Sequence, residues 1–314
     1  MAKGHQKKKH FTPRQAHRHK QMENYRMKTI PEKISVLNIR VNNLTMDELL
    51  SKLDQGMVVT PNIDHFIKLQ KDKIFYHTYQ QADYTLLDSR VVYYMLRLFG
   101  CPIKGVIPGS DLLPAFCRYH RDNPDIKIFL LGSMNGIAHQ AMTRINEKAK
   151  RAMVVDACSP SRGFDTQKAE CRSIVEKINR SGANVLVVGV GAPKQELWLA
   201  KHLPETPNIK IAMALGATID FEAGFRRRPH RYIQKVGMEW FFRFLSEPGR
   251  LWKRYFVDDV PFFWLFLKQR AGVYRNPFDH SALARTNKMT NPGNSEIKTS
   301  KPVEHKKIKI QDLH

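Results

Sequence analysis

Polar side chains and glycines follow four segments that we predict to be buried strands, and these residues have the types and spacing that could do chemistry. At each place an apolar run ends and a short polar loop begins. The groups are Thr60 with Asn62, Asp88 with Arg90, the turn 189–195, and Thr218 with Asp220. Because the carboxyl ends of parallel strands meet at one edge of an α/β sheet, we expect these loops to form one cleft.

The clearest of these loops lies in Val185–Ala200, VLVVGVGAPKQELWLA, which indicates a buried strand, a tight turn and the start of a helix. Backbone N–H groups at such a turn attract phosphate, and glycine lets the backbone come close to the ligand. We therefore predict an anion site here. Its predicted residues are Gly189, Gly191, Lys194, Gln195 and Glu196. A purely structural turn is the alternative, and the third glycine of a dinucleotide-binding fingerprint is absent.

The 314-residue chain has a formal net charge of +23, which is concentrated toward its two ends. Residues 1–28 contain nine Lys or Arg and one acidic residue, and residues 226–275 contain twelve and four. Such segments imply an anionic partner, which is membrane lipid, nucleic acid or a diphosphate. The four cysteines form no C-x-x-C pair, which fits a reducing compartment. We find no signal segment and no apolar run of about eighteen residues, so we expect neither secretion nor a spanning helix.

Strands and helices alternate through the middle of the chain, which predicts an α/β, Rossmann-like, mostly parallel sheet flanked by helices. The predicted strands are 34–41 (an edge strand), 57–60, 84–87, 127–131, 153–156, the run from 185, and 209–215. The predicted helices are 45–53, 66–82, 91–99, 108–121, 137–150 and 167–180. The predicted domains are a disordered basic tail at 1–30, a catalytic α/β domain at 31–224, a helical appendage at 225–275 and a disordered tail at 276–314.

Residues 226–275 are predicted to be helical and combine basic with aromatic side chains, as an interfacial membrane element does. Arginines would lie on lipid phosphates, at about 1 kcal/mol per basic residue, with aromatic rings at the headgroup level. The run 260–267 is too short to span a bilayer but long enough to enter its acyl boundary. The alternative is that the rings pack on the sheet and the arginines are solvated.

Seven segments, in order, resemble the WecG/TagA/CpsF glycosyltransferases, glycosyltransferase family 26, over residues 36–255. They are TPNIDH (60–65), ADYTLLDS (82–89), PGSDLL (108–113), FLLG (129–132), GVGAPKQE (189–196), GATIDFEAG (216–224) and GMEWFFRFLSEPGRLWKRY (237–255). An ordered set of this length is far more specific than any single motif.

The resemblance implies inverting transfer of a sugar from a UDP-sugar to a polyprenyl-diphosphate-linked saccharide, for surface polysaccharide, at the cytoplasmic face of the membrane. The family's proposed general base matches Asp88, which would take the proton of the acceptor hydroxyl. A helix-capping aspartate is the alternative at that position. Thr60, Asn62 and Gln195 match family residues that are expected to line the cleft.

Two positions depart from the family pattern. Ser89 stands where the family usually has glycine, and Val106 stands where it often has a phosphate-binding arginine. Lys104 or Arg90 are candidate substitutes for that arginine. Because no Asp-x-Asp motif occurs, we expect no metal or other cofactor, and the departing UDP would be neutralised by the helix N-terminus after Gly191 and by C-terminal arginines. The candidate arginines are Arg228, Arg231, Arg250 and Arg254.

A nucleic-acid-binding protein is the main alternative, because it would also use basic chain ends. Polar strand-end loops have no use in a purely electrostatic binder, and no helix-turn-helix, KH or RNP pattern occurs, so we expect no nucleic acid partner. We do not expect a nucleotide-dependent oxidoreductase, because this sequence lacks the third glycine and the ribose-binding acidic residue that such an enzyme has. A non-catalytic scaffold is a further alternative. The donor sugar is not specified, and the sequence is compatible with a monomer or a homo-oligomer.

Overall fold

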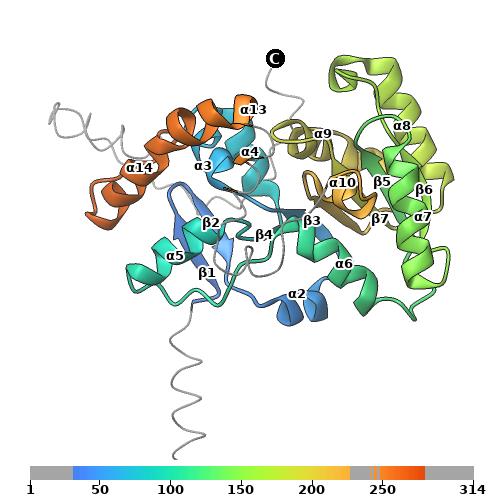
Figure 1. Ribbon diagram of the computed structural model, residues 1–314, viewed down its shortest axis with the longest axis horizontal. Helices are drawn as coiled ribbons and strands as arrows, with labels where there is room; N and C mark the ends of the chain where they lie inside the picture. The colour runs from blue at the N-terminus through green and yellow to red at the C-terminus, as the bar shows by residue number, and fades with distance from the viewer. Residues whose placement is uncertain (1–30, 227–240, 242–243, 246–247, 280–314) are drawn as a thin grey trace, which may run out of the picture.

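The computed structural model describes residues 31–226, 241, 244–245 and 248–279. Its centre is a six-stranded sheet in which neighbouring strands run parallel, in the order β4-β3-β8-β7-β5-β6 (Figure 1). The strands are β3 Gly56–Val59, β4 Tyr84–Thr85, β5 Ile128–Gly132, β6 Val154–Cys158, β7 Val185–Gly189 and β8 Ile211–Ala214. The predicted Rossmann-like α/β class is confirmed.

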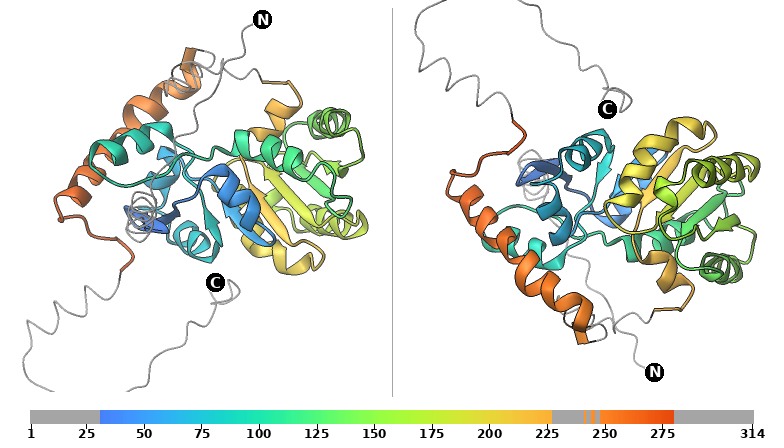
Figure 2. Two further views of the ribbon diagram at one scale, coloured as in Figure 1. Left: turned by 90° about the horizontal axis from the view of Figure 1, so that it is seen from below. Right: turned by 90° about the horizontal axis from the view of Figure 1, so that it is seen from above.

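Helices cover both faces of this sheet, because successive residues of a strand point to opposite sides. In β3, Met57 and Val59 join one hydrophobic core, and Val58 between them joins the other. The first core is covered by α3 Ile63–Lys68, α4 Lys73–Gln81, α5 Arg90–Leu98, α8 Lys168–Arg180 and α9 Lys194–His202. The second is covered by α2 Met46–Lys52, α6 Gly109–Tyr119, α7 Ile137–Ala149 and α10 Thr218–Glu222. Figure 2 shows the strands between the two layers of helices.

Residues 34–41, predicted as one edge strand, form part of a hairpin instead. β1 Lys33–Val36 and β2 Ile39–Asn42 pair antiparallel in a separate two-stranded sheet. The chain reverses at Leu37, whose φ of 52° is in the left-handed region that a continuous strand does not use. A long strand and the two arms of a short hairpin have the same alternating apolar pattern, so the pattern did not reveal the turn.

Residues 66–82, predicted as a single helix, belong to two helices, and the first begins earlier. α3 begins directly after Asn62, whose Oδ1 accepts the N–H of His65 at 3.4 Å. α4 begins after Asp72, whose carboxylate caps it. Asn62 therefore lies at a helix N-terminus rather than in an open loop. The other predicted strands and helices of the α/β domain agree with the observed ones apart from their end residues, and α10 was not predicted.

The C-terminal region contains the predicted helices in its described part, although residues 225–226 and 271–275 are not helical. α13 Pro248–Lys253 leads through a π-helical segment, Arg254–Asp258, into α14 Val260–Arg270, which packs against α3 and α5 (Figure 1). Phe262 and Phe266 are fully buried in the first core. The membrane interpretation is therefore wrong for these two rings, because they are buried in the core and cannot contact lipid.

The predicted tails at 1–30 and 280–314 lie outside the described residues, as do residues 227–240, 242–243 and 246–247. Both tail predictions stay predictions there. Asn276 Nδ2 donates to the Tyr76 hydroxyl at 3.1 Å, and the Phe278 ring lies 5.2 Å from that of Tyr76. Packing against α4 thus continues beyond residue 275, the predicted end of the appendage.

Candidate active site

Asp88 is half-buried, beyond the carboxyl end of β4 and beside the N-terminus of α6. Its Oδ1 accepts the N–H of Gly109, the first residue of α6, at 3.2 Å. Its own N–H donates to the carbonyl of Pro61 at 3.2 Å, which joins it to the loop after β3. A carboxylate is favourably placed at a helix N-terminus. The position fits both predicted roles, a general base and a helix-capping aspartate.

Thr60 and Asn62 lie at the end of the neighbouring strand, β3, but their environments differ. The Thr60 hydroxyl is buried and donates to the carbonyl of Ala214 at 3.2 Å, so it ties the end of β3 to that of β8. Asn62 is half-buried, and its Oδ1 accepts from Arg254 at 3.4 Å. Asn62 is the more accessible of the two predicted substrate ligands.

The two glycines of the turn after β7 serve different purposes. A Cβ at Gly189 would lie 2.5 Å from the carbonyl oxygen of Gly216, so packing between β7 and β8 requires glycine there. Gly191 has a φ of 85°, and a Cβ on it would meet nothing within 4 Å. The close approach that we predicted at Gly189 is to another backbone, and only Gly191 borders open space.

Gln195, predicted to lie beside the bound group, is buried beneath the turn. Its Oε1 accepts the N–H of Gly191 at 3.3 Å and that of Gly216 at 3.1 Å. Only 2% of its surface is exposed. Gln195 therefore ties the turns after β7 and β8 together and occupies two N–H groups of the kind that we predicted for phosphate.

Glu196 is completely buried, and it holds the Gln195 amide in place. Its Oε1 accepts from Gln195 Nε2 at 2.8 Å and lies 3.6 Å from His65 Nε2. The His65 Nδ1 accepts the N–H of Asn62 at 2.9 Å, so the neutral ring carries its proton on Nε2, toward Glu196. Burial lowers the pKa of His65 to about 3 and raises the pKa of Glu196 to about 7. Glu196 thus has a structural position under the site instead of the predicted ligand position.

We expect Glu196→Gln to stabilise the protein increasingly as the pH rises. Folding raises the pKa of Glu196 from 4.5 to about 7. The proton bound to Glu196 therefore contributes fully to stability below about pH 4.5, and this contribution is lost as the pH rises through 7. Glutamine keeps an oxygen for the Gln195 amide and has no proton to lose. The gain in the free energy of unfolding should reach about 3 kcal/mol at pH 8.5. Urea unfolding of both proteins at pH 5 and pH 8.5 measures it, and a difference that is equal at both values would contradict the prediction.

Lys194 and Thr218 also have structural partners. The Lys194 ammonium lies 2.9 Å from Asp165, in the 3₁₀ segment η1 Phe164–Thr166. The hydroxyl of Thr218 is buried and donates to the carbonyl of Leu215 at 2.6 Å, where α10 begins. Lys194 stays exposed, whereas Thr218 is not accessible to a substrate.

Asp220 lies on α10, at the same edge of the sheet. Its Oδ1 accepts from the Ser133 hydroxyl, which follows β5, and its Oδ2 lies 3.1 Å from Arg226 Nε. The carboxylate is therefore already hydrogen-bonded and paired, and it links the ends of β5 and β8 to the start of the C-terminal region.

Among the candidate arginines, Arg254 reaches one other predicted residue, Asn62, and also Asp64, which was not predicted. Its Nη2 lies 3.4 Å from Asn62 Oδ1 and 3.5 Å from Asp64 Oδ2. Arg90 is half-buried at the start of α5, two residues after Asp88. Arg228, Arg231 and the side chain of Arg250 lie outside the described residues.

A family model described as the glycosyl transferase WecG/TagA/CpsF family matches residues 34–276. The chain belongs to this family. Curated relatives include two proteins named N-acetylglucosaminyldiphosphoundecaprenol N-acetyl-beta-D-mannosaminyltransferase, from Staphylococcus aureus strains MRSA252 and MW2. The first is 23% identical over 231 residues, which are 71% of this chain and 86% of the relative. The second is 22% identical over 231 residues, with the same shares.

Membership of the WecG/TagA/CpsF family makes this protein a glycosyltransferase and confirms the resemblance found in the sequence. The match extends through α13 and α14, so these helices are part of the chain that the family shares. No helix in the described part of the chain is long and apolar enough to cross a membrane. Nor do the described residues contain a group of three or more His, Cys, Asp or Glu side chains that could hold a metal ion. Metal independence stays a prediction.

One residue of this glycosyltransferase that our sequence reasoning missed is Lys68, on α3. Its ammonium lies 2.7 Å from Asp64 Oδ2 and 3.4 Å from the carbonyl oxygen of Ala192, in the turn after β7. The spacing of Asp64 and Lys68, four residues apart on a helix, was visible in the sequence. The contact with the turn was not, because it joins residues far apart in the chain.

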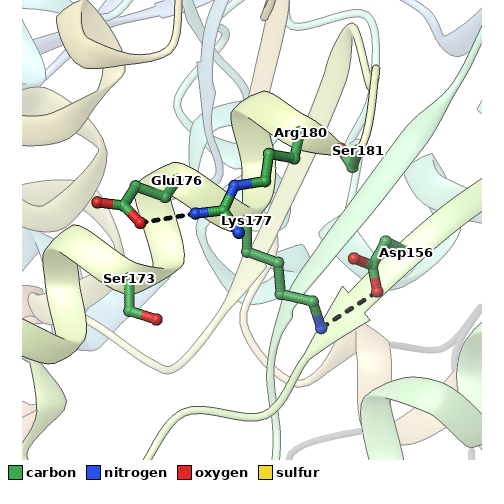
Figure 3. A pocket seen from close by; sticks show the side chains of 6 residues that line it. All are labelled: Asp156, Ser173, Glu176, Lys177, Arg180 and Ser181. Carbon is green, nitrogen blue, oxygen red and sulfur yellow. Dashed lines mark hydrogen bonds and ion pairs between the residues drawn. The ribbon is translucent and has the colours of Figure 1, made fainter.

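A hollow elsewhere on the glycosyltransferase lies between β6 and α8 (Figure 3). It contains no predicted site residue. Its basic side chains are already paired, Lys177 with Asp156 at 3.2 Å and Arg180 with Glu176 at 2.9 Å. The hollow is therefore separate from the predicted site at the carboxyl edge of the sheet.

Proposed function

We propose that this glycosyltransferase moves a sugar from a UDP-sugar to a polyprenyl-diphosphate-linked saccharide, with inversion, in surface polysaccharide biosynthesis. The observation that carries the proposal is the meeting of Asp88, the loop after β3 and Arg254 at one edge of the sheet. The names of the relatives support a lipid-diphosphate acceptor and an N-acetylmannosamine-type sugar. The alternatives, a nucleic-acid-binding protein and a non-catalytic scaffold, are not favoured, because the family consists of glycosyltransferases.

In the proposed reaction Asp88 takes the proton of the acceptor hydroxyl. The hydroxyl oxygen attacks the anomeric carbon from the side opposite UDP, and the bond from that carbon to the UDP oxygen breaks. UDP leaves with the bonding electrons, so negative charge develops on its diphosphate. Arg254, held at Asn62 and Asp64, is placed to offset that charge. The proposed reaction uses no metal ion.

UDP release in the presence of a panel of UDP-sugars and a short-chain prenyl-diphosphate N-acetylglucosamine acceptor tests the proposal. We expect release with at least one sugar, dependent on the acceptor, and a disaccharide product of inverted anomeric configuration. Chelation of divalent cations should leave the rate unchanged. Absence of acceptor-dependent release across the panel would refute the proposed substrates.

The proposed membrane contact is supported by an exposed apolar stripe on α14. Val260, Phe263, Trp264 and Leu267 have helical i, i+3, i+4, i+7 spacing and are 50%, 39%, 62% and 46% exposed. The stripe lies opposite the buried Phe262, so α14 is apolar on two sides, of which the core covers one. The residues before α14 add an exposed cluster of aromatic rings, in which the ring centroids of Trp252 and Phe256 lie 4.6 Å apart.

The positive charge of this region favours an anionic lipid surface as the binding partner of the exposed stripe. Lys253 and Lys268 flank the apolar residues on the same helices, and residues 226–275 carry a large excess of basic side chains. Lysine and arginine beside interfacial aromatic rings bind lipid phosphates. We place the enzyme peripherally on the inner face of the cell membrane, where a lipid-linked acceptor is confined.

We expect the double change Phe263→Ser, Trp264→Ser to lower binding to anionic liposomes by at least about tenfold, since two interfacial aromatic residues are lost. Both side chains are exposed, so the thermal unfolding temperature should change little. Co-sedimentation with anionic lipid vesicles measures the effect. Tyr119→Ser is the matched control, because Tyr119 is 56% exposed at the far end of α6. Equal binding by the wild type and the double variant would assign membrane contact elsewhere.

A further inference from the structure

Lys68 places a positive charge at the turn after β7, and two contacts hold it there. Its ammonium donates to Asp64 Oδ2 at 2.7 Å and to the Ala192 carbonyl at 3.4 Å. A lysine ammonium has three N–H donors, so one donor direction is left after these two contacts. The side chain is 36% exposed, and a ligand at the turn can reach it.

Asp64 holds a second cation beside the first. Arg254 Nη2 lies 3.5 Å from the same carboxylate oxygen that accepts from Lys68. Although burial alone would raise it, the pKa of Asp64 is lowered, because Arg254 and Lys68 lie beside its carboxylate. Two cations from separate parts of the chain, α3 and the π-helical segment, therefore share one ionised carboxylate next to the turn.

Two backbone N–H groups of the kind that we expected at this turn are already engaged. The N–H groups of Gly191 and Gly216 both donate to Gln195 Oε1, and Gln195 is buried. The Lys194 ammonium, on the same turn, pairs with Asp165 at 2.9 Å and is 47% exposed, so it also keeps donors for a ligand. A diphosphate at this turn would therefore bind charged side chains, Lys68 on α3 among them, rather than the two N–H groups that Gln195 occupies.

We propose that Lys68 is a ligand of the donor's diphosphate and supplies a positive charge from α3 at the turn after β7. This inference rests on the proposed function, because it takes a nucleoside diphosphate as the donor. It assigns to Asp64 the role of positioning residue, which holds Lys68 and Arg254 at the turn. A charge-assisted hydrogen bond to phosphate is stronger than a neutral one. The loss of Lys68 should therefore lower the affinity for the nucleoside diphosphate but not the affinity for the nucleoside.

Calorimetric titration of the full chain with UDP and with uridine tests the inference. We expect Lys68→Met to weaken UDP binding roughly tenfold, with uridine binding unchanged, and Lys68→Arg to retain most of the UDP affinity. Lys71→Met is the matched control, because Lys71 is exposed three residues further along the chain. Circular dichroism checks that each variant folds. Lys68→Gln, which keeps donors for Asp64 and Ala192 without the charge, replaces the methionine variant if that one does not fold.

The outcomes separate this inference from the function on which it rests. If the wild type does not bind UDP, the proposed donor is wrong and the inference falls with it. If the wild type binds UDP and the folded Lys68 variants bind it equally well, Lys68 only holds the turn. A parallel loss of UDP and uridine affinity also overturns the inference, because it indicates distortion of the turn and not loss of a phosphate ligand.

Discussion

Replacement of Asp88 by asparagine is expected to lower turnover by about 10²–10⁴-fold, the usual contribution of a general base. Asparagine has nearly the same size, and its Oδ1 can still accept the N–H of Gly109 that Asp88 accepts at 3.2 Å. The contact with α6 should therefore survive, and UDP binding should be close to that of the wild type. The acceptor-dependent UDP release assay measures turnover, and calorimetry measures UDP binding.

Asp83→Asn is the matched control for this experiment. Asp83 precedes the same strand, β4, at its opposite end, and its Oδ2 accepts the N–H of Met57 at 2.8 Å. Both aspartates thus accept a backbone N–H from a neighbouring segment, but only Asp88 lies at the carboxyl edge of the sheet. Turnover should be normal in the Asp83 variant. A near-normal rate in the Asp88 variant would remove Asp88 from the mechanism and leave it as a helix cap.

Phe262→Ala is expected to destabilise the protein by about 3–5 kcal/mol, the usual cost of truncating a buried phenylalanine. Phe262 has no exposed surface, and its ring lies 5.4 Å from that of Phe66, on α3. The cavity would open between α14 and α3, the helix that Asn62 caps and that carries Lys68. Equilibrium unfolding in urea, followed by far-ultraviolet circular dichroism, measures the loss.

The neighbouring Phe263 provides the control, because it is the same residue type on the other side of α14. It is 39% exposed, so Phe263→Ala should cost less than about 1 kcal/mol. The two variants should also differ in liposome binding, which only the Phe263 change should reduce directly. Equal destabilisation by both changes would show that α14 does not pack on the core in solution.

Much of the fold could be predicted because its signals are local. The apolar run at 185–189 and the helical period of 168–180 match β7 and α8 closely. Two of the errors also have local causes. The hairpin at 33–42 has the same alternation as a long strand, and the break between α3 and α4 depends on the capping residue Asp72, which lies inside an otherwise helical pattern.

The candidate site was predictable only in part, for a physical reason that Gln195 illustrates. Its place after a strand and two glycines predicted a residue beside the ligand. In the structure, its side-chain oxygen instead accepts a hydrogen bond from the N–H of Gly216, which follows a different strand. Whether a polar side chain faces solvent or another turn depends on the strand that lies next to it. The order of the strands in the sheet, here β8 beside β7, cannot be deduced from the sequence of either strand.

The sequence by itself determined the fold class, the family and the position of Asp88 at a strand end, because periodicity and ordered motifs are properties of neighbouring residues. Only the tertiary structure decided which of these residues meet. It buried Gln195 and Glu196, separated Phe262 from Phe263, and brought Lys68 and Arg254 to one carboxylate. These outcomes come from packing between segments that are distant in the chain, and no local pattern records such contacts.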